Sequence, residues 1–195
     1  LQSAKVFHFG SLSLIEEPSR SATLAAVEIA KAAGALISFD VNYRAKLWSR
    51  EAAYARVMAT LPHVDLLKIN EGELALLTDS ARPEESAKTL LAYGPRLIVV
   101  TLGPGGSYFQ TAEGGDYVPA FTVDTVDATG CGDAFIAGLH WQFIQGGDWQ
   151  AQLAAARLRQ VLRYANAVGA LTALKLGVIP SLPTAAAVEE FLKIV

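Results

Sequence analysis

A glycine-rich turn followed by an acid is the stretch of this sequence best suited to chemistry. The sequence Asp-Ala-Thr-Gly-Cys-Gly-Asp-Ala-Phe occupies residues 127–135, and an apolar run follows it. The first amides of a helix lack acceptors within the helix, and the helix dipole adds partial positive charge there. If a helix starts at this turn, the amides near Gly130–Asp133 form a cradle for an anion, and phosphate is the usual occupant.

Asp133 is an unusual neighbour for such a cradle, because its carboxylate would repel the anion. The repulsion makes sense if Asp133 faces a hydroxyl that must lose its proton while it attacks a phosphorus atom. The other interpretation is that Asp133 only caps the helix. The spacing alone leaves both interpretations open.

Other phosphate-binding motifs do not match this chain. The P-loop pattern G-x-x-x-x-G-K-[ST] and the protein-kinase motifs are absent. The dinucleotide pattern G-x-G-x-x-G is nearly met by Gly130 and Gly132, but its third position is Phe135, which is too bulky for close packing of helix on strand. The sequence therefore disfavours NAD binding.

Strands that alternate with helices are predicted to position this turn. Short apolar runs typical of buried parallel strands lie at 5–10, 35–41, 64–70 and 96–103. Segments with helical composition lie at 18–34, 50–61, 71–78 and 83–93. A β-hairpin is predicted from 105–110 and 115–121, and further helices from 132–145, 149–174 and 184–194. The order predicts an α/β fold with a mostly parallel sheet.

The composition fits one α/β domain over residues 1–195 and argues against several classes of protein. Hydrophobic residues make up 52% and charged residues 18%, which is unlike a disordered chain. The net charge is −3, and no basic run offers a footprint for nucleic acid. No apolar run reaches the ~18–20 residues that span a membrane. The single cysteine, Cys131, fits a reducing compartment, so we expect a cytoplasmic protein.

Five segments in order resemble the pfkB (ribokinase-like) carbohydrate kinases. The turn DATGCGDAF resembles the family signature D-T-x-G-A-G-D, and KINEGELALL (68–77) resembles the N-x-x-E motif. FDVNYRAKLW (39–48) resembles a stretch of fructokinases and 2-keto-3-deoxygluconate kinases. VTLGPGGSYF (100–109) and YANAVGALT (164–172) resemble nucleotide-binding segments. The resemblance implies a ribokinase-like three-layer α/β/α sandwich, of which this chain is the carboxy-terminal two-thirds, without the amino-terminal strands and lid.

The resemblance assigns catalytic roles to five residues. Asp133 is implied to be the base that accepts the proton of a sugar hydroxyl, and Arg44 to reach the transferring phosphate or the sugar. The amides of Gly130, Cys131 and Gly132 are implied to stabilise charge on the transferred group. The Cys131 thiol is either a reactive group with a lowered pKa at a helix start, or a small packing residue; we favour packing.

The resemblance also implies residues for the nucleotide. Thr101, Gly103 and Gly106 match the segment along the phosphates and ribose, although the same residues could form only a tight turn between strands. Asn166 matches the position beside the adenine, or is an ordinary polar residue of a helix. Asn42 is expected near the nucleotide or its phosphates.

Two acids are implied metal residues. Glu73 resembles the acid that helps to hold Mg²⁺, commonly through water, with Asn70 beside it. The alternative is that Asn70 caps a helix whose first turn contains Glu73, and both roles can hold together. Asp127 matches a residue that helps to bind a monovalent cation such as K⁺. For Asp40 we expect a buried hydrogen-bonding role rather than a substrate contact.

The predicted function is phosphorylation of the primary hydroxyl of a ketose by ATP, with fructokinase as the first hypothesis. The alternatives are 2-keto-3-deoxygluconate kinase and a non-catalytic nucleotide-binding fragment. Sugar and ATP are the expected partners, and nucleic acid and membranes are not. The lid and most sugar contacts of the family have no counterpart here, so we expect little activity of this chain alone. An exposed sheet edge would favour self-association, for instance as a homodimer.

Overall fold

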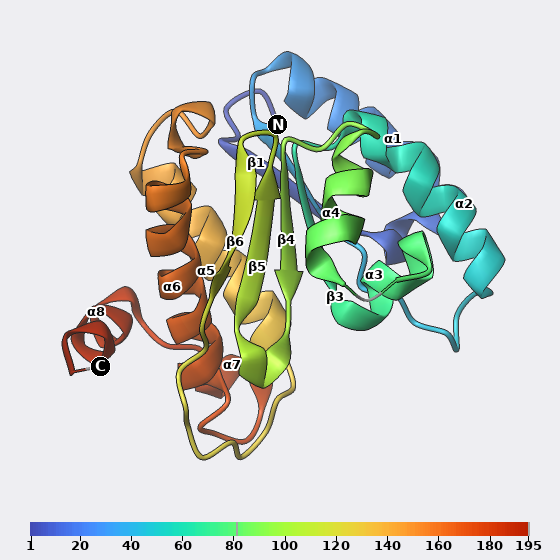
Figure 1. The fold of residues 1–195 in the computed structure, drawn as a ribbon. Helices are drawn as coiled ribbons and strands as arrows, with labels where there is room; N and C mark the ends of the chain where they lie inside the picture. The colour runs from blue at the N-terminus through green and yellow to red at the C-terminus, as the bar shows by residue number, and fades with distance from the viewer. Residues whose placement is uncertain (81, 195) are drawn as a thin grey trace. The chain divides into compact units, whose positions relative to one another are not determined.

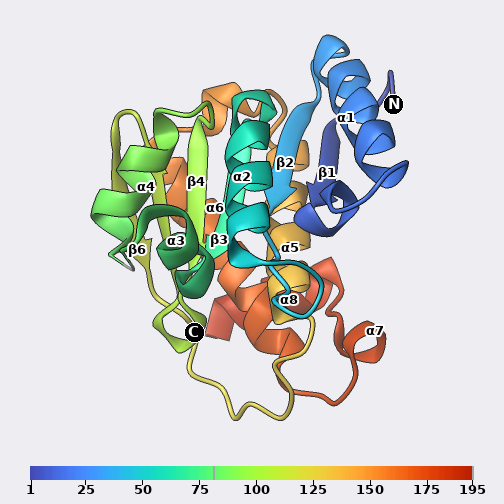
Figure 2. The same cartoon turned by 90° about the vertical axis from the view of Figure 1, so that its right-hand side faces the viewer.

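The computed structural model describes residues 1–80 and 82–194, and Figures 1 and 2 show it from two sides. The chain divides into two compact units. The first comprises Leu1–Val100 and Phe109–Gly115, and the second comprises Thr101–Tyr108 and Asp116–Val195. The expectation of one domain over residues 1–195 therefore stays a prediction.

Six strands form one sheet in the order of the sequence, β1 to β6. Their bounds are Val6–Gly10 (β1), Leu36–Asp40 (β2), Leu66–Asn70 (β3), Leu97–Thr101 (β4), Ser107–Thr111 (β5) and Gly114–Val118 (β6). The pairs β1–β2 and β2–β3 are parallel, as predicted. In their register Asp40 lies beside Gly10 on one side and beside Lys68 on the other, so these strands end at a common edge.

The helices of the first unit follow the predicted segments closely. They are α1 (Ser19–Ala32), α2 (Arg50–Thr60), α3 (Glu71–Thr78) and α4 (Pro83–Leu91). Strand β2 is buried along its whole length, and β3 is buried up to Asn70, which explains why their sequences read as continuous apolar runs. Each strand ends in a polar residue, Asp40 or Asn70, where the chain turns away from the sheet.

The second unit is mainly helical and contains α5 (Cys131–Gln145), α6 (Ala155–Thr172), α7 (Val178–Ser181) and α8 (Ala185–Ile194). Helices α5 and α6 lie side by side (Figure 1) and pack closely, because a Cβ on Gly138 would stand 2.8 Å from Val168 Cγ2. Among the described residues, none of the helices has the length and apolar character that crossing a membrane requires.

Two predicted elements differ from the structure. The prediction of one helix over 149–174 is wrong at its start, because α6 begins at Ala155 after a short 3₁₀ turn, Gln150–Gln152. The buried Gln152 amide donates to the carbonyls of Phe143 and Asp148, and these contacts hold the turn apart from the helix. The predicted hairpin is present as the neighbours β5 and β6, but only residues 112–113 separate the two strands.

Candidate active site

The glycine turn of the second unit leads directly into helix α5. Gly130 is the N-cap residue and has φ +81°, a left-handed conformation that favours glycine. A Cβ on Gly130 would stand 2.5 Å from Val178 Cγ1, so packing also requires glycine here. The Cys131 amide donates to the Ala128 carbonyl at 3.2 Å. This hydrogen bond closes the turn. The Cys131 amide, which was predicted to bind an anion, is therefore already paired within the chain.

The amides of Gly132 and Asp133 remain open at the start of α5. In the described parts of the chain neither has an acceptor, and no side chain caps the helix. The Asp133 carboxylate lies in the first turn, is exposed and makes no hydrogen bond or ion pair with described residues. The capping interpretation of Asp133 thus has no hydrogen bond to support it. Two donors and a free carboxylate share one helix end.

Cys131 and Asp127 have structural contacts in the same loop. Burial and the nearby Asp127 carboxylate raise the pKa of the Cys131 thiol. A reactive cysteine would have a lowered pKa, so this shift supports the expectation that Cys131 is a packing residue. Asp127 Oδ1 accepts from the Thr129 amide at 2.9 Å, and Oδ2 accepts from the Gly177 amide at 3.3 Å. Hydrogen bonds from Thr129, followed by the one from Gly177, lower the pKa of Asp127. Asp127 therefore ties this loop to Gly177.

The segment predicted to contact the nucleotide forms the turn between β4 and β5. Gly103–Gly105 is a 3₁₀ turn, and the Leu102 amide donates to the Gly106 carbonyl at 2.9 Å. Gly106 has φ +93°, and a Cβ there would stand 2.2 Å from the Val118 carbonyl oxygen. Gly103 has φ +55°, and a Cβ there would meet nothing within 4 Å. Packing thus requires Gly106, whereas Gly103 borders open space.

Asn166 is 8% exposed in the middle of α6, and its side-chain amide donates to the carbonyls of Val118 and Pro119, each at 3.1 Å. This contact joins α6 to the chain segment that follows β6. The side chain is thus engaged in a structural role, and contact with an adenine ring stays a prediction. Thr101 lies at the end of β4 and is partly exposed.

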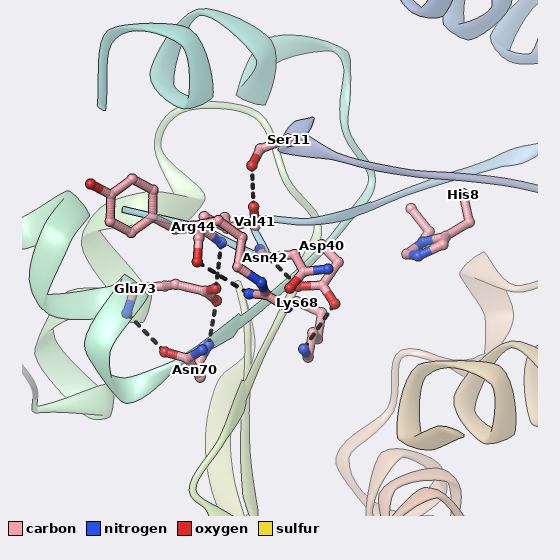
Figure 3. Close-up of polar contacts among 11 residues, drawn as sticks. His8, Ser11, Asp40, Val41, Asn42, Arg44, Lys68, Asn70 and Glu73 are labelled. Carbon is pink, nitrogen blue, oxygen red and sulfur yellow. Dashed lines mark hydrogen bonds and ion pairs between the residues drawn. The ribbon is translucent and has the colours of Figure 1, made fainter. Parts of the chain in front are cut away.

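In the first unit, a buried ion pair lies at the carboxyl end of β2 and β3 (Figure 3). Lys68 Nζ donates to Asp40 Oδ2 at 2.8 Å, and both side chains are less than a tenth exposed. Asp40 Oδ1 accepts from the Asn42 amide at 3.2 Å, which supports the left-handed backbone of Asn42 at φ +41°. The buried role expected for Asp40 is confirmed.

The segment after β2 presents Arg44 to solvent. Arg44 is exposed, and its Nη1 donates to the Tyr43 carbonyl at 3.1 Å. The Tyr43 hydroxyl donates to the Trp48 carbonyl at 3.2 Å. Ser11 Oγ donates to the Val41 carbonyl (Figure 3), which ties the chain after β1 to the same segment. Short-range and long-range contacts together therefore fix this loop.

Asn70 and Glu73 form a complete capping box at the start of α3. Asn70 Oδ1 accepts from the Glu73 amide, and Glu73 Oε2 accepts from the Asn70 amide, both at 2.9 Å. The other carboxylate oxygen, Glu73 Oε1, accepts a second amide, that of Tyr43, at 2.9 Å. Glu73 is 4% exposed, and burial raises its pKa, with a further upward contribution from Asp40. The helix-capping alternative for this pair is confirmed.

Glu73 and Asp127, the two acids expected at metal ions, fit direct coordination poorly. Both oxygens of Glu73 and both oxygens of Asp127 already accept backbone amides. Across residues 1–80 and 82–194, no group of three or more histidine, cysteine, aspartate or glutamate side chains could hold a metal ion. The roles expected for Glu73 at Mg²⁺, commonly through water, and for Asp127 at a monovalent cation stay predictions.

Lys68 and Tyr43 were missed as parts of this network. Lys68 appears in the sequence as one charged residue within the apolar run LLKIN, which is a signal of a buried partner. Its partner becomes evident only with the strand register, which places Lys68 beside Asp40. Tyr43 contributes its backbone amide, for which a sequence gives no signal.

Known proteins resemble this chain over nearly its whole length. The family model described as "pfkB family carbohydrate kinase" matches residues 1–185. This chain belongs to the pfkB carbohydrate kinase family. It is 44% identical over 196 residues to Probable fructokinase-2 of Arabidopsis thaliana and 43% identical over 195 residues to Fructokinase-2 of Solanum lycopersicum. It covers 59% of the length of each of these proteins, while the matches span 100% and 99% of this chain. Another curated relative from Arabidopsis thaliana, 44% identical, is covered over 90% of its length.

Solved structures confirm the predicted ribokinase-like α/β fold. The fructokinase from Xylella fastidiosa with bound ATP matches with a TM-score of 0.91 and 29% identity, over 99% of this chain and 62% of that one. The fructokinase from Vibrio cholerae O395 in a form with fructose, ADP and calcium ion matches with a TM-score of 0.90 and 34% identity, over 98% and 62%. This pfkB-family chain thus spans about three-fifths of the length of these two kinases and of the first two relatives named above.

Proposed function

We propose that this pfkB-family chain is the nucleotide-binding and catalytic part of an ATP-dependent fructokinase, which converts fructose to fructose 6-phosphate. The observation that carries the proposal is the start of α5, where two amides with no acceptor among the described residues lie beside the exposed carboxylate of Asp133. Similarity to fructokinases over the whole chain, including structures with ATP, or with fructose and ADP, supports the choice of reaction.

The chain's own groups divide the work at this helix end. ATP supplies the phosphoryl group when it is bound. The amides of Gly132 and Asp133, together with the α5 dipole, favour negative charge beside them and would hold that group. Asp133 would accept the proton of the attacking sugar hydroxyl. A carboxylate is a weak base towards an alcohol, but a loose transition state tolerates this because little bond to the nucleophile has formed.

The proposal assigns further roles to the turn between β4 and β5 and to Arg44. Gly103 borders open space, and we expect the nucleotide to approach the turn between β4 and β5 there. Thr101 and Gly106 shape this turn. Arg44 is exposed, as a contact to phosphate or sugar requires. Sugar and ATP are the proposed small-molecule partners, and the cytoplasm is the proposed compartment because the chain has one cysteine. A homodimer is the proposed assembly.

A phosphoryl-transfer assay tests the proposal. The chain is incubated with γ-labelled ATP, Mg²⁺ and one acceptor at a time, namely fructose, 2-keto-3-deoxygluconate or aminoimidazole riboside. Transfer to fructose above the other two is expected. Preference for the sugar acid would favour the 2-keto-3-deoxygluconate kinase. The riboside is included because a solved aminoimidazole riboside kinase matches at a TM-score of 0.87. ATP binding without transfer to any acceptor would favour the non-catalytic alternative.

A further inference from the structure

The carboxylate of Glu73 does more than cap its own helix. A capping box needs only the reciprocal pair with Asn70, for which Glu73 Oε2 is sufficient. The second oxygen, Oε1, accepts the amide of Tyr43, 30 residues earlier in the sequence, at 2.9 Å. One buried side chain therefore joins the start of α3 to the segment that follows β2 (Figure 3).

Two successive amides of that segment are held by buried carboxylates. Asp40 Oδ1 accepts the Asn42 amide at 3.2 Å, and Glu73 Oε1 accepts the Tyr43 amide at 2.9 Å. Lys68 fixes Asp40 from the other side at 2.8 Å. The backbone held in this way includes the left-handed Asn42, which has no intrinsic preference for φ +41° strong enough to hold it there alone.

We propose that Glu73 is a positioning residue for Arg44, acting through the backbone of Asn42 and Tyr43, and not a metal ligand. Arg44 directly follows the clamped residues, and its guanidinium rests on the Tyr43 carbonyl. Glu73 holds the amide on the amino-terminal side of Tyr43, and only φ and ψ of Tyr43 separate this amide from the carbonyl that accepts from Arg44. The clamp thus limits where Tyr43 and the start of Arg44 can lie. The consequence for catalysis rests on the proposed function, whereas the clamp on the backbone does not.

Burial and charge both favour this assignment. Glu73 is 4% exposed, and each of its oxygens already accepts a backbone amide. Mg²⁺ retains its waters and needs room for them, which a side chain enclosed in this way does not offer. Glu71, in the same helical turn, is exposed and would be the more accessible acid.

Backbone exchange tests the clamp without any need for activity. Amide hydrogen exchange is measured on the whole chain for wild type, Glu73→Ala and Asn70→Ala. The Asn70 variant breaks the capping box but keeps the Glu73 contact to Tyr43, so it is the matched control. The Tyr43 amide is expected to exchange about tenfold or more faster in Glu73→Ala than in Asn70→Ala, because a hydrogen bond to a charged acceptor is lost only in the former. Equal exchange in the two variants would overturn the proposal.

A second pair of measurements separates positioning from metal binding. Glu73→Gln, which keeps the side-chain shape, and the control Glu71→Gln are titrated with Mg²⁺·ATP by calorimetry. The dependence of ATP affinity on Mg²⁺ is expected to be the same in Glu73→Gln as in wild type. A tenfold weaker dependence of ATP affinity on Mg²⁺ would overturn the proposal. Glu73→Gln also serves if Glu73→Ala does not fold.

The link to Arg44 is tested by a double-mutant cycle on the rate of transfer. If Glu73 acts through Arg44, Glu73→Gln lowers kcat in the wild-type background but not in Arg44→Ala, and KM for ATP changes little. Additive losses would show that Glu73 does not act through Arg44 and would overturn that step. If the wild-type chain transfers no phosphate, the proposed function fails, while the exchange experiment still decides whether the clamp exists.

Discussion

Helices α3 and α5 share an acid at the same position of the first turn but differ in how the amides at their starts are satisfied. Each has an acid three positions after its N-cap, Glu73 after Asn70 and Asp133 after Gly130. Glu73 is buried and its two oxygens accept two amides, while Asp133 is exposed and makes no contact with described residues. The first helix start is closed by its own side chains, and the second is left open to a ligand.

The difference follows from the residue at the N-cap. Asn70 has a side-chain oxygen that accepts the amide of Glu73, so the helix end satisfies itself. Gly130 has no side chain to accept an amide, and within residues 1–80 and 82–194 the amides of Gly132 and Asp133 have no acceptor. An unsatisfied helix start is costly unless water or a ligand fills it, which is why we assign function to α5 and structure to α3.

The largest expected effect is on catalysis at the open helix start. Asp133→Asn should lower phosphoryl transfer by about 10²–10⁴-fold, the usual contribution of a general base. ATP affinity and melting temperature should stay near wild type, because Asp133 is exposed and has no partner in the described chain. Labelled transfer, calorimetry with ATP and thermal unfolding measure the three quantities.

Asp124→Asn is the matched control for that variant, because Asp124 is an exposed aspartate of the same unit. It should leave all three quantities unchanged. Near-normal transfer in Asp133→Asn would remove Asp133 from its role, and the contrast between the two helix starts would then have no catalytic meaning.

Adding a Cβ at the open helix start should cost stability. Gly130→Ala places alanine at φ +81° and its Cβ 2.5 Å from Val178 Cγ1. The unfavourable backbone conformation alone should lower the free energy of unfolding by on the order of 1–3 kcal/mol.

Gly147→Ala is the control, since Gly147 has φ +82° but a Cβ there would meet nothing within 4 Å. Denaturant unfolding should show the larger loss for Gly130→Ala, and the double variant with Val178→Ala should recover the difference. Equal losses would contradict the packing argument.

Removing the cap of the closed helix start should have a smaller effect. Asn70→Ala removes the side-chain oxygen that accepts the Glu73 amide, so one of the two hydrogen bonds of the capping box is lost. The expected loss is about 1–2 kcal/mol, near the top of the range for N-caps. Ser49→Ala is the control, because Ser49 caps α2 by accepting the Ala52 amide at 3.2 Å, and an alanine at that position cannot complete a capping box. Urea unfolding of both variants gives the comparison, and a larger loss for Ser49→Ala would contradict it.

Most helices and strands, and the capping box at the start of α3, could be predicted from the sequence. Strands β2 and β3 read as apolar runs because they are buried along nearly their whole length, and the spacing of Asn70 and Glu73 predicts the box from local contacts alone. Contacts between distant residues were not predictable. Lys68 and Asp40 are 28 residues apart, and Asn166 reaches Val118 across 48 residues, so both pairs depend on the tertiary fold.

The open helix start was predicted in position but not in detail. The glycines of residues 130–132 indicate a turn, yet only the structure shows that the Cys131 amide is consumed by Ala128 and that Val178 packs on Gly130. The break before α6 was missed because alanine and glutamine favour helix, while the buried side-chain contacts of Gln152 outweigh that local preference.

The smallest expected effect is the pH dependence that the closed helix start adds to stability. Burial, then Asp40, raises the pKa of Glu73, while hydrogen bonds from Asn70 and Tyr43 and the charge of Lys68 oppose the shift. A carboxyl whose pKa is higher in the folded state binds its proton more tightly there, so its protonated form favours folding. The contribution of Glu73 should therefore decline as pH rises from the ordinary glutamate value of about 4.3 through its folded pKa. A ¹³C titration of the Glu73 carboxyl by NMR should give a pKa above that value, with Asp127, whose pKa is lowered, as the opposite case in the same spectrum. A Glu73 pKa below the ordinary value would mean that the hydrogen bonds from its amide donors outweigh burial. The ionised carboxylate, and not the protonated form, would then stabilise the closed helix start.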